Sequence, residues 1–299
     1  MRVFDLGELR KLKKRSEEPE NGQVTIIGGS DLFHGAPILA LKTAARIVDM
    51  VFFSSPQPSV GRIAELLKSR LGSFIWVPWE EVDAYIEKSD AILIGPGMKR
   101  WHKESEKFRG QNSKLLDHAG TETKFVTEKL LGQFSQKKWV IDGGALQVMD
   151  EKLIPEGAIL TPNVKEFKML FNLKIKRSLA FQAENEKVKT TTKILKLIRE
   201  KAKEYKCTIV YKAPRTIVCS PDECVEVPGG NPGLTKGGTG DVLAGLTVAL
   251  FAQNPALLAG AGASWVVKKA ADNLFEKVGT VYNSDDLAEE VPKVLGKYL

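Results

Sequence analysis

VTIIGGSDLFHGAPILALKTAARIV, residues 24–48, holds two hydrophobic patterns one after the other. Residues 24–29 form a short apolar run that stops at two glycines, which is typical of a buried strand. Residues 37–48 carry apolar side chains at helical spacing and predict a helix packed on a core. Because a strand followed by a helix is the unit from which parallel sheets are built, this stretch predicts the start of a βαβ unit.

The same alternation continues along the chain. Further short apolar runs stop at Gly, Pro, Ser or Asn and predict buried strands at 49–55, 73–79, 91–97, 138–144 and 158–163. Helical patterns lie between them at 60–71, 80–89 and 121–134. Repeated strand–helix–strand units connect right-handedly and form a mostly parallel sheet with helices on both faces. We therefore predict an α/β fold.

The later part of the chain departs from this alternation. A charged helix is expected around 186–205, and closely spaced strands at 207–227 predict antiparallel pairing at one edge of the sheet. Three further helices are expected to begin near 240, at Pro255 and at Asn283. The remaining assignments are a polar N-terminal arm at 1–21, a polar loop at 99–119 and a single domain at 22–299.

The amino-acid composition limits the kinds of molecule that the protein is expected to bind. The 299-residue chain is 43% apolar and 27% charged, the balance of a globular protein with a sizeable core. Its net charge of +7 favours anionic ligands in a general way. The basic stretches at 10–15 and 99–110 lie among glutamates, which indicates a solvated surface. Because neither a signal sequence nor an apolar run of membrane length is visible, we expect a cytoplasmic protein without nucleic-acid or membrane partners.

Cysteine and histidine are scattered along the chain. The cysteines are Cys207, Cys219 and Cys224, and the histidines are His34, His102 and His118. Neither set has the spacing of metal ligands. A low and odd number of cysteines fits a reducing compartment, so free thiols are expected.

Residues 228–241, PGGNPGLTKGGTGD, lead into the apolar helix VLAGLTVALFAQ. Glycines let a backbone approach a ligand closely, and the free N–H groups at a helix N-terminus attract an anion. The spacing matches neither a Walker A loop nor a GxGxxG turn, yet a phosphate is the natural ligand. Asp241 would repel that phosphate unless it accepts a proton from an attacking hydroxyl. The alternative, in which Asp241 only caps the helix, fits the spacing equally well.

Other candidate residues lie where predicted strands end, which is where open α/β sheets bind ligands. Asp142 stands beside two glycines, where it would help hold a hydrated Mg²⁺ or lie in a buried turn. Asn163 and Glu166 have the spacing of a capping box. Lys212 would meet a phosphate or protect a sheet edge. His34 would touch a ligand or have no specific role.

These segments, in this order, resemble the ADP- or ATP-dependent NAD(P)H-hydrate dehydratases of the ribokinase-like superfamily. The resemblance runs from about residue 24 to 263 and rests on GGSDLFHGAPILA (28–40), AILIGPGM (91–98), AILTPNVKEF (158–167) and VYKAPRT (210–216). The most specific segment is GGNPGLTKGGTGDVLAGLTVALFAQ (229–253). Its Gly-Thr-Gly-Asp core is shared with ribokinase-like kinases, whereas its Gly-Asn-Pro-Gly lead-in is similar to the dehydratases. The resemblance implies a ribokinase-like three-layer sandwich.

The resemblance also implies an activity. Members of this family repair NADH or NADPH that has become hydrated on the nicotinamide ring: ADP or ATP phosphorylates the ring hydroxyl, and phosphate is then eliminated. It implies small-molecule substrates, Mg²⁺ and a homo-oligomer. It further implies a separate, functionally linked epimerase that interconverts the two hydrate stereoisomers, because residues 1–23 are too few to form one.

Carried over residue by residue, the resemblance implies a role for each site position. Asp241 would be the base, and the amides of Gly238, Thr239 and Gly240 would hold the transferred phosphate. The nucleotide would be bordered by Lys212, Thr216 and Gly240. The hydrated dinucleotide would contact Ala36, Gly97, Asn163 and Asp241, and a metal would meet Asp142.

Three positions depart from the family pattern. Lys99 stands where the family has a further glycine, Gly144 replaces a carboxylate and Asn163 replaces a histidine. The phosphate side is therefore intact, whereas the substrate side is altered. Two alternatives stay open: a ribokinase-like kinase that phosphorylates a hydroxymethyl or hydroxyethyl heterocycle, and a nucleotide-binding protein that has lost its chemistry.

Overall fold

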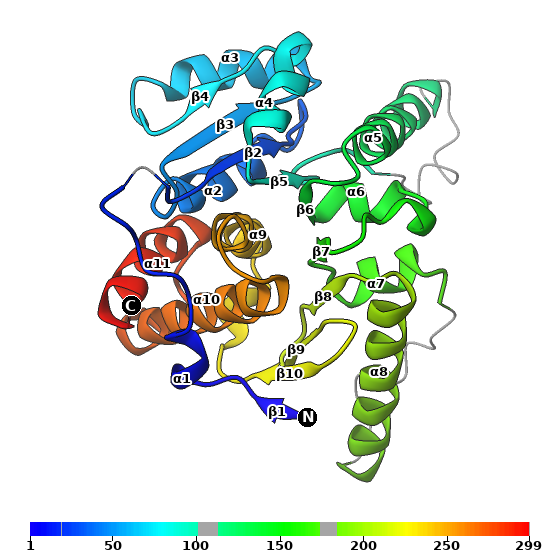
Figure 1. Cartoon of the computed structure of the whole chain (residues 1–299), viewed down its shortest axis with the longest axis vertical. Coiled ribbons are helices and arrows are strands. Elements are labelled where there is room, and N and C mark those ends of the chain that lie inside the picture. Colours follow the sequence, from blue (N-terminus) through cyan, green and yellow to red (C-terminus); the bar gives the residue numbers. More distant parts are fainter. Residues whose placement is uncertain (19, 101–112, 174–183, 299) are drawn as a thin grey trace.

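A computed structural model describes residues 1–18, 20–100, 113–173 and 184–298. Over these residues, ten strands form one sheet in the order β1-β10-β9-β8-β7-β6-β5-β2-β3-β4. Figure 1 shows that this sheet is twisted and lies between two groups of helices. The strands are β1 (Arg2–Val3), β2 (Gln23–Ile27), β3 (Met50–Ser54), β4 (Ile75–Trp76), β5 (Ala91–Ile94), β6 (Lys138–Ile141), β7 (Ile159–Leu160), β8 (Thr208–Tyr211), β9 (Thr216–Cys219) and β10 (Cys224–Val227).

Most of the sheet is parallel, as predicted. The neighbouring strands from β4 across to β8 pair in parallel, whereas β9 pairs antiparallel with both β8 and β10. Antiparallel strands need only a tight turn between them, while parallel strands need a long crossover. The closely spaced strands between 207 and 227 therefore form the predicted antiparallel edge.

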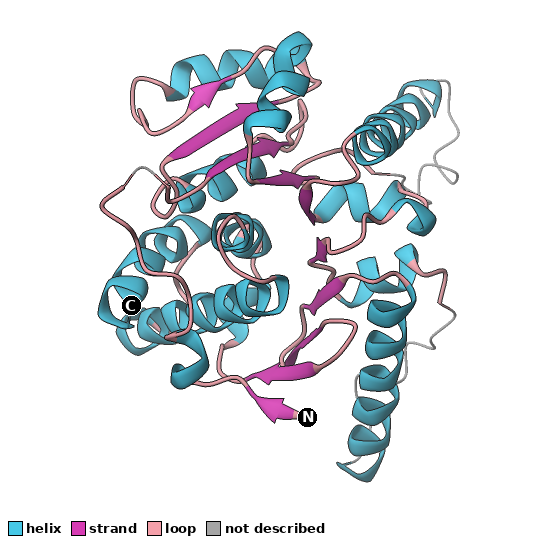
Figure 2. Cartoon of the chain, in the orientation of Figure 1, coloured by secondary structure: helices cyan, strands magenta, loops and turns pink. Residues whose placement is uncertain are grey.

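Helices cover both faces of the sheet (Figure 2), which confirms the α/β class. One face carries α2 (Gly35–Ala44), α3 (Pro58–Leu67), α9 (Thr239–Phe251), α10 (Ala256–Val278) and α11 (Ser284–Tyr298). The other carries α4 (Val82–Lys88), α5 (Ser113–Gln133), α6 (Gly143–Val148), α7 (Val164–Leu170) and α8 (Glu184–Glu204). None of the helices in the described part of the chain is long and apolar enough to cross a membrane.

Side chains of the central strands alternate between two separate cores. In β5, Ala91 and Leu93 belong to one core, and Ile92 and Ile94 belong to the other. A sheet covered on both faces needs apolar side chains at every strand position, because neither face meets water. This is why the strands appear in the sequence as continuous apolar runs.

The strand order reverses next to β2. From β2 the chain passes to β3 and then to the edge strand β4, and it returns to the other side of β2 with β5. Open α/β sheets bind ligands outside the carboxyl ends of the strands at such a switch point. The ends of β2 and β5 therefore mark the rim at which a site is expected.

The N-terminal arm is less polar than predicted. Its first residues form β1, which pairs in parallel with β10, and the short helix α1 (Leu6–Leu9) follows. Leu9 and Leu12 are buried, and Leu12 packs next to Gly262 of α10. A two-residue strand with exposed side chains leaves no hydrophobic pattern, so the sequence did not indicate it. The domain boundary at residue 21 stays a prediction.

The polar loop predicted at 99–119 is too long. Helix α5 begins at Ser113, so the predicted helix at 121–134 extends backward over part of that loop. The residues from 113 onward carry a weak helical pattern that polar composition obscured. Residues 101–112, which include His102, lie outside the described residues.

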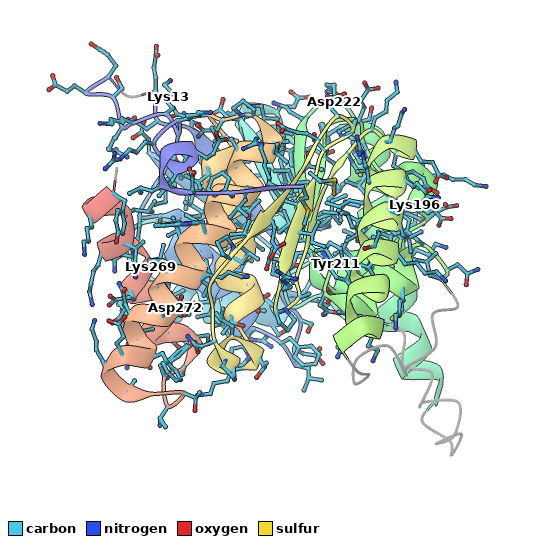
Figure 3. All side chains as sticks on the ribbon, turned by 90° about the horizontal axis from the view of Figure 1, so that it is seen from below. Lys13, Lys196, Tyr211, Asp222, Lys269 and Asp272 are labelled. Atoms are coloured by element: carbon cyan, nitrogen blue, oxygen red, sulfur yellow. A yellow bond between two sulfur atoms is a disulfide. The ribbon has the colours of Figure 1, made fainter. Side chains whose placement is uncertain are left out.

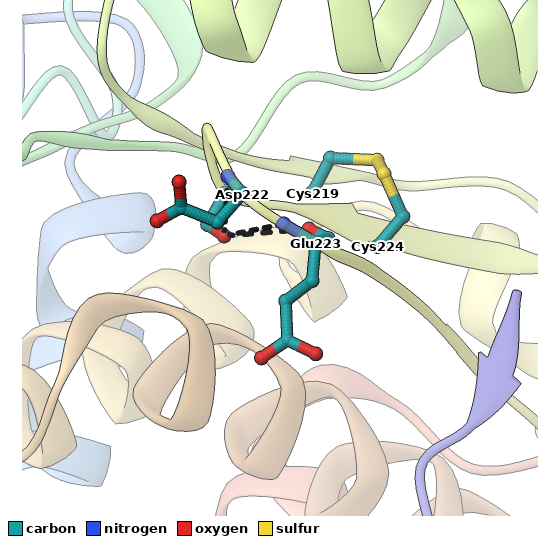
Figure 4. Close-up of a disulfide and its surroundings, with 5 residues drawn as sticks. Cys219, Asp222, Glu223 and Cys224 are labelled. Atoms are coloured by element: carbon teal, nitrogen blue, oxygen red, sulfur yellow. Dashed lines mark hydrogen bonds between the residues drawn. A yellow bond between two sulfur atoms is a disulfide. The ribbon is translucent and has the colours of Figure 1, made fainter.

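The expectation of free thiols is wrong for two of the three cysteines. Cys219 and Cys224 form a disulfide across the β9–β10 hairpin (Figure 4). The two residues are direct partners in the antiparallel ladder, so the hairpin itself brings their sulfur atoms together. Cys207 is a free thiol, and its burial raises its pKa to about 12, which leaves it unreactive.

Candidate active site

The glycine-rich stretch ends in the first turn of α9. Gly238 is the N-cap residue, and its φ of 91° is a conformation that favours glycine. No side chain caps this helix, and Asp241 is its third residue. The alternative in which Asp241 serves only as a cap is therefore wrong, and the carboxyl group is left for another purpose.

A lysine cation at the end of β8 joins carboxyl groups that follow β6 and β7 and a third one on α9. Lys212 Nζ donates to Asp142 Oδ1 at 2.7 Å and lies 3.9 Å from Glu166 Oε2. Thr161 Oγ1 donates a second hydrogen bond to Asp142 Oδ1 at 2.6 Å. Asp142 and Glu166 are 2% and 6% exposed, so both carboxyl groups are buried beside the lysine and have little contact with water. Asp241 interacts electrostatically with all three groups, which completes the charge cluster.

The charge cluster shifts the pKa of its own members. Burial, and then the charge of Asp142, raise the pKa of Asp241 to about 7, while Lys212 lowers it. Burial also raises the pKa of Glu166. Burial acts to lower the pKa of Lys212, but Asp142 and Glu166 hold it above its usual value. Near neutral pH the lysine is charged and Asp241 can both take and release a proton, as a general base must.

Asn163 and Glu166 form the predicted capping box at the start of α7. Asn163 Oδ1 accepts hydrogen bonds from the N–H groups of Lys165 at 2.8 Å and Glu166 at 3.0 Å. Glu166 Oε2 accepts from the Asn163 N–H at 2.8 Å. Glu166 is a site residue that the sequence pattern did not predict. The signal was available, because a capping box directly after a strand turns its glutamate back toward the strand end.

The start of α9 offers a place for an anion. A Cβ added at Gly240 would lie 3.2 Å from Lys212 Nζ, so the helix backbone and the ammonium are close neighbours. The hydroxyl of Thr239 donates to the carbonyl oxygens of Leu234 at 2.8 Å and Lys236 at 2.9 Å, and so holds the loop. Backbone N–H groups beside a lysine cation suit a phosphate. We call residues 238–240 with Lys212 the anion cradle.

Two loops touch at the ends of β2 and β5. A Cβ added at Gly28 would lie 2.3 Å from the carbonyl oxygen of Pro96, and one at Gly97 would lie 2.2 Å from that of Phe33. Gly97 has a φ of 71°, and its added Cβ would also lie 3.2 Å from Ala36 Cβ. Ala36 and Gly97 are therefore neighbours. We call the surface formed by residues 28–36 and 95–99 the floor.

The floor adjoins the anion cradle through α2 and α9. A Cβ added at Gly238 would lie 2.6 Å from Leu39 Cδ1, and one at Gly245 would lie 2.3 Å from the carbonyl oxygen of Ala40. The two helices are therefore packed against each other. Ala36 is the second residue of α2, one turn before the Leu39 that Gly238 contacts.

Two departures from the family pattern have structural consequences in the floor. Lys99 Nζ pairs with Asp31 Oδ1 at 2.6 Å, and this pair ties the loop after β5 to the loop after β2. A Cβ added at Gly144 would lie 2.2 Å from the carbonyl oxygen of Met98. The backbone after β5 therefore occupies the space that a side chain at position 144 would need, and a carboxylate there is incompatible with this loop.

Thr216 and His34 stand apart from the charge cluster. Thr216 is 5% exposed and its hydroxyl donates to the carbonyl oxygen of Ala213 at 3.2 Å, so it shapes the turn that follows Lys212. His34 is an exposed N-cap residue of α2 without a capping side-chain hydrogen bond. The structure gives His34 no site role.

Comparison with solved structures defines the class of fold. A ribokinase-like superfamily protein from Enterococcus faecalis superposes with a TM-score of 0.75 at 24% identity, covering 99% of this chain and 96% of the other. The ADP/ATP-dependent NAD(P)H-hydrate dehydratase from Bacillus subtilis, crystallized with ATP and Mg²⁺, gives 0.72 at 20% identity, covering 100% and 99%. The fold is therefore ribokinase-like.

Sequence comparison then gives the family. The family model of the NAD(P)H-hydrate dehydratases matches residues 24–293. A bifunctional NAD(P)H-hydrate repair enzyme from Methanocaldococcus jannaschii is 32% identical over 97% of this chain and 51% of its own length. An ADP-dependent (S)-NAD(P)H-hydrate dehydratase from Nitrosopumilus maritimus is 28% identical, over 95% and 91%. This chain belongs to the NAD(P)H-hydrate dehydratase family, and it spans about half the length of the bifunctional relatives.

Proposed function

We propose that this protein dehydrates hydrated NADH or NADPH, with ADP or ATP as the phosphoryl donor. One observation carries the proposal: a carboxyl group with its pKa raised to about 7, that of Asp241, stands at the start of a helix that forms the anion cradle. Relatives over nearly the whole chain are named as dehydratases of this kind, which supports the choice of substrate.

The first step is a phosphoryl transfer. Asp241 accepts the proton of the ring hydroxyl, and that oxygen attacks the terminal phosphorus of the nucleotide. The bond between this phosphorus and the bridging oxygen breaks, and AMP leaves from ADP, or ADP leaves from ATP. The backbone N–H groups of residues 238–240 and the ammonium of Lys212 neutralise the charge that spreads over the transferred group.

The second step is an elimination. The ring carbon–oxygen bond breaks, and inorganic phosphate leaves with the electron pair. The lone pair of the ring nitrogen stabilises the electron-poor carbon. Loss of a proton from the adjacent carbon then restores the double bond of the reduced nicotinamide. Phosphate is a far better leaving group than hydroxide, which explains why a dehydration would consume a nucleotide.

The other site residues serve binding in this proposal. Lys212, with the turn shaped by Thr216, borders the nucleotide phosphates. Ala36 and Gly97 lie against the dinucleotide in the floor. Asn163 contacts it through its amide nitrogen, because its side-chain oxygen is committed to the helix.

The charge cluster fits a hydrated Mg²⁺ that is shared with nucleotide phosphates. Asp142 Oδ1 and Glu166 Oε2 both point at one position, now held by Lys212 Nζ at 2.7 and 3.9 Å. Mg²⁺ is commonly held by one or two carboxylates and keeps its remaining contacts to water and phosphate oxygens. No group of three potential ligands gathers among the described side chains, so the protein alone would not hold the ion. When bound, Mg²⁺ would neutralise phosphate charge.

The proposed function includes a cellular location and protein partners. We expect a cytoplasmic homo-oligomer that works with an epimerase acting on the hydrate stereoisomers. The relatives named as bifunctional repair enzymes support a link between two repair activities. Light scattering of the purified chain would check the oligomeric state.

A spectroscopic assay tests the proposed function. The protein is incubated with Mg²⁺, hydrated NADH or NADPH, and ADP or ATP, and the absorbance of the reduced nicotinamide is followed. We expect nucleotide-dependent recovery of that absorbance together with release of inorganic phosphate. Nucleotide consumption that leaves a stable phosphate ester would instead favour the kinase alternative, and absence of any turnover would contradict both enzyme hypotheses.

A further inference from the structure

Within the described part of the chain, the Gly-Asn-Pro-Gly lead-in at 230–233, the segment most similar to the dehydratases, forms its hydrogen bonds away from the charge cluster. Its contacts run instead to α10 and to residues 280–284, the segment that joins α10 to α11. We call this segment the brace. Four successive positions of the glycine-rich loop meet the brace before the loop enters α9.

The first contact is a hydrogen-bond relay through Asn231. Its Oδ1 accepts from the hydroxyl of Tyr282 at 2.8 Å and from the N–H of Gly233 at 3.0 Å. Its Nδ2 donates to Asp272 Oδ1 at 3.2 Å, and Asp272 Oδ2 accepts from the Gly230 N–H at 3.1 Å. Asp272 lies on α10 (Figure 3). The asparagine thus uses donor and acceptor atoms to join loop, brace and helix.

The second contact is steric. A Cβ added at Gly233 would lie 2.4 Å from the ring of Tyr282, and Tyr282 is 2% exposed. Only a glycine lets the loop backbone lie flat on this buried ring. The motif glycine and the tyrosine therefore depend on each other.

The third and fourth contacts lie next to the anion cradle. Lys236 Nζ donates to the carbonyl oxygens of Thr280 and Tyr282, each at 2.5 Å. A Cβ added at Gly238 would lie 2.5 Å from Ser284 Oγ, so the N-cap of α9 rests on the end of the brace. The loop is therefore held from the motif up to the first residue of the cradle.

We propose that Tyr282 and Lys236 are positioning residues for phosphoryl transfer, which hold the amides of residues 238–240 in the geometry that the transferred group requires. This inference rests on the proposed function. A loop with glycines at 229, 230, 233, 237 and 238 loses much backbone entropy when it is ordered, so external contacts must supply its rigidity. Donors that stabilise developing charge act only when they are already in place, and a small displacement is costly.

The position of the brace also predicts which kinetic constant it controls. The hydrogen bonds of Tyr282 and Lys236 join the loop to the brace, whereas in the proposed function the nucleotide is bordered by Lys212 and the turn containing Thr216. Loosening the loop should therefore lower kcat far more than it weakens ground-state binding of the nucleotide. A purely structural role would instead lower the folded fraction and leave the kcat of the folded enzyme unchanged.

The test compares three variants of the full chain. Tyr282→Phe removes one hydroxyl and keeps the ring, and Lys236→Met removes the ammonium and keeps most of the stem. Tyr205→Phe is the matched control, because it removes a hydroxyl that meets Glu204 on the opposite face of the sheet. For each variant, kcat, the Kd of ADP, the Tm and the amide hydrogen exchange of residues 238–241 are measured.

We expect Tyr282→Phe to lower kcat about 2- to 12-fold, the range that one hydrogen bond supplies. Lys236→Met should lower it about 10- to 100-fold, because a misplaced donor set costs up to that much. In both variants the Kd of ADP should change less than about twofold, and exchange at 238–241 should become faster. Tyr205→Phe should resemble the wild type in all four measurements.

Two results would contradict the positioning role of Tyr282 and Lys236. One is an unchanged kcat in both Tyr282→Phe and Lys236→Met. The other is a fall in kcat that matches the loss of folded protein, without faster hydrogen exchange at residues 238–241. If the wild type itself recovers no reduced nicotinamide, the dehydratase proposal fails. The exchange measurements need no turnover, so they still decide whether the brace orders the cradle.

Discussion

The charge cluster and the floor adjoin each other but are built by different means. In the charge cluster, buried Asp142 and Glu166 are held by one lysine and by hydroxyl and amide donors at defined distances. In the floor, backbone packs on backbone: Gly97 lies against Phe33, and the ion pair of Lys99 with Asp31 has one partner well exposed. Under the proposed function, the groups that act on the reaction are thus held by other charges, whereas the surface that binds the substrate is held by close packing.

This difference predicts different kinetic phenotypes. Changes in the charge cluster remove interactions that develop in the transition state, and they should lower kcat. Changes in the floor alter the shape of a binding surface, and they should raise KM for the hydrated dinucleotide. The altered positions Lys99 and Gly144 lie on the floor side, so we expect them to tune substrate fit and to leave the transfer chemistry intact.

The largest effect is expected from Asp241→Asn. The amide keeps the shape of the carboxyl group but cannot accept the hydroxyl proton, so kcat should fall about 10³-fold, within the range of a lost general base. The Kd of ADP should change less than about twofold. Asp222→Asn, in the turn between β9 and β10, is the matched control. A variant with substantial activity would show that another group is the base.

Lys212→Met should have the next largest effect. It leaves buried Asp142 and Glu166 without their cation, and we expect kcat to fall about 10- to 100-fold, as for loss of a charge-stabilising donor. Since Lys212 lowers the pKa of Asp241, the pH midpoint of the remaining activity should move upward. Lys196→Met, an exposed lysine of α8, is the control. An unchanged pH midpoint would contradict the electrostatic link between Lys212 and Asp241.

The wild type should lose activity as the pH falls. Asp241 accepts a proton only when it is ionised, and its pKa is raised to about 7. Below that value the protonated fraction grows, so kcat/KM should fall about tenfold between pH 8 and pH 6. Steady-state rates across that range measure the midpoint. A midpoint near the usual value of an aspartate would mean that the buried surroundings of Asp241 do not set its ionisation.

The smallest effect is expected in the floor. Gly97→Ala would place a Cβ 2.2 Å from the carbonyl oxygen of Phe33 at a φ of 71°, so the two loops must separate. We expect KM for the hydrated dinucleotide to rise about 3- to 10-fold with kcat nearly unchanged, because the loss is in ground-state binding. Gly132→Ala, at an exposed helical glycine with free space around it, is the control. A fall in kcat at unchanged KM would remove the distinction between floor and charge cluster.

The sequence predicts most of the fold for a physical reason. Strands such as β5 are buried on both faces and therefore apolar at every position, and each stops at a glycine or polar residue at the rim. The same pattern places Asp142 at the end of β6 and Lys212 at the end of β8, on either side of β7, and the structure joins them in one ion pair. Local patterns suffice where burial and chain direction determine the position of a residue.

Features that depend on pairing partners were not visible in the sequence. The disulfide between Cys219 and Cys224 needs the register of the β9–β10 hairpin, which a count of cysteines does not give. Strand β1 exists because β10 offers it a free edge. Glu166 and Lys212 come from two different strand ends and meet only in the folded chain. In the sequence, the capping box already explains Glu166 and protection of a sheet edge already explains Lys212, so nothing indicated their contact.

Both outer strands of the sheet, β1 and β4, are only two residues long. An edge so short offers few free N–H and C=O groups for another chain to extend the sheet, which protects the molecule from uncontrolled strand-to-strand aggregation. The predicted homo-oligomer should therefore assemble through its helical layers. We therefore expect self-association of this chain to depend on side-chain complementarity between helices and not on hydrogen bonds between strands.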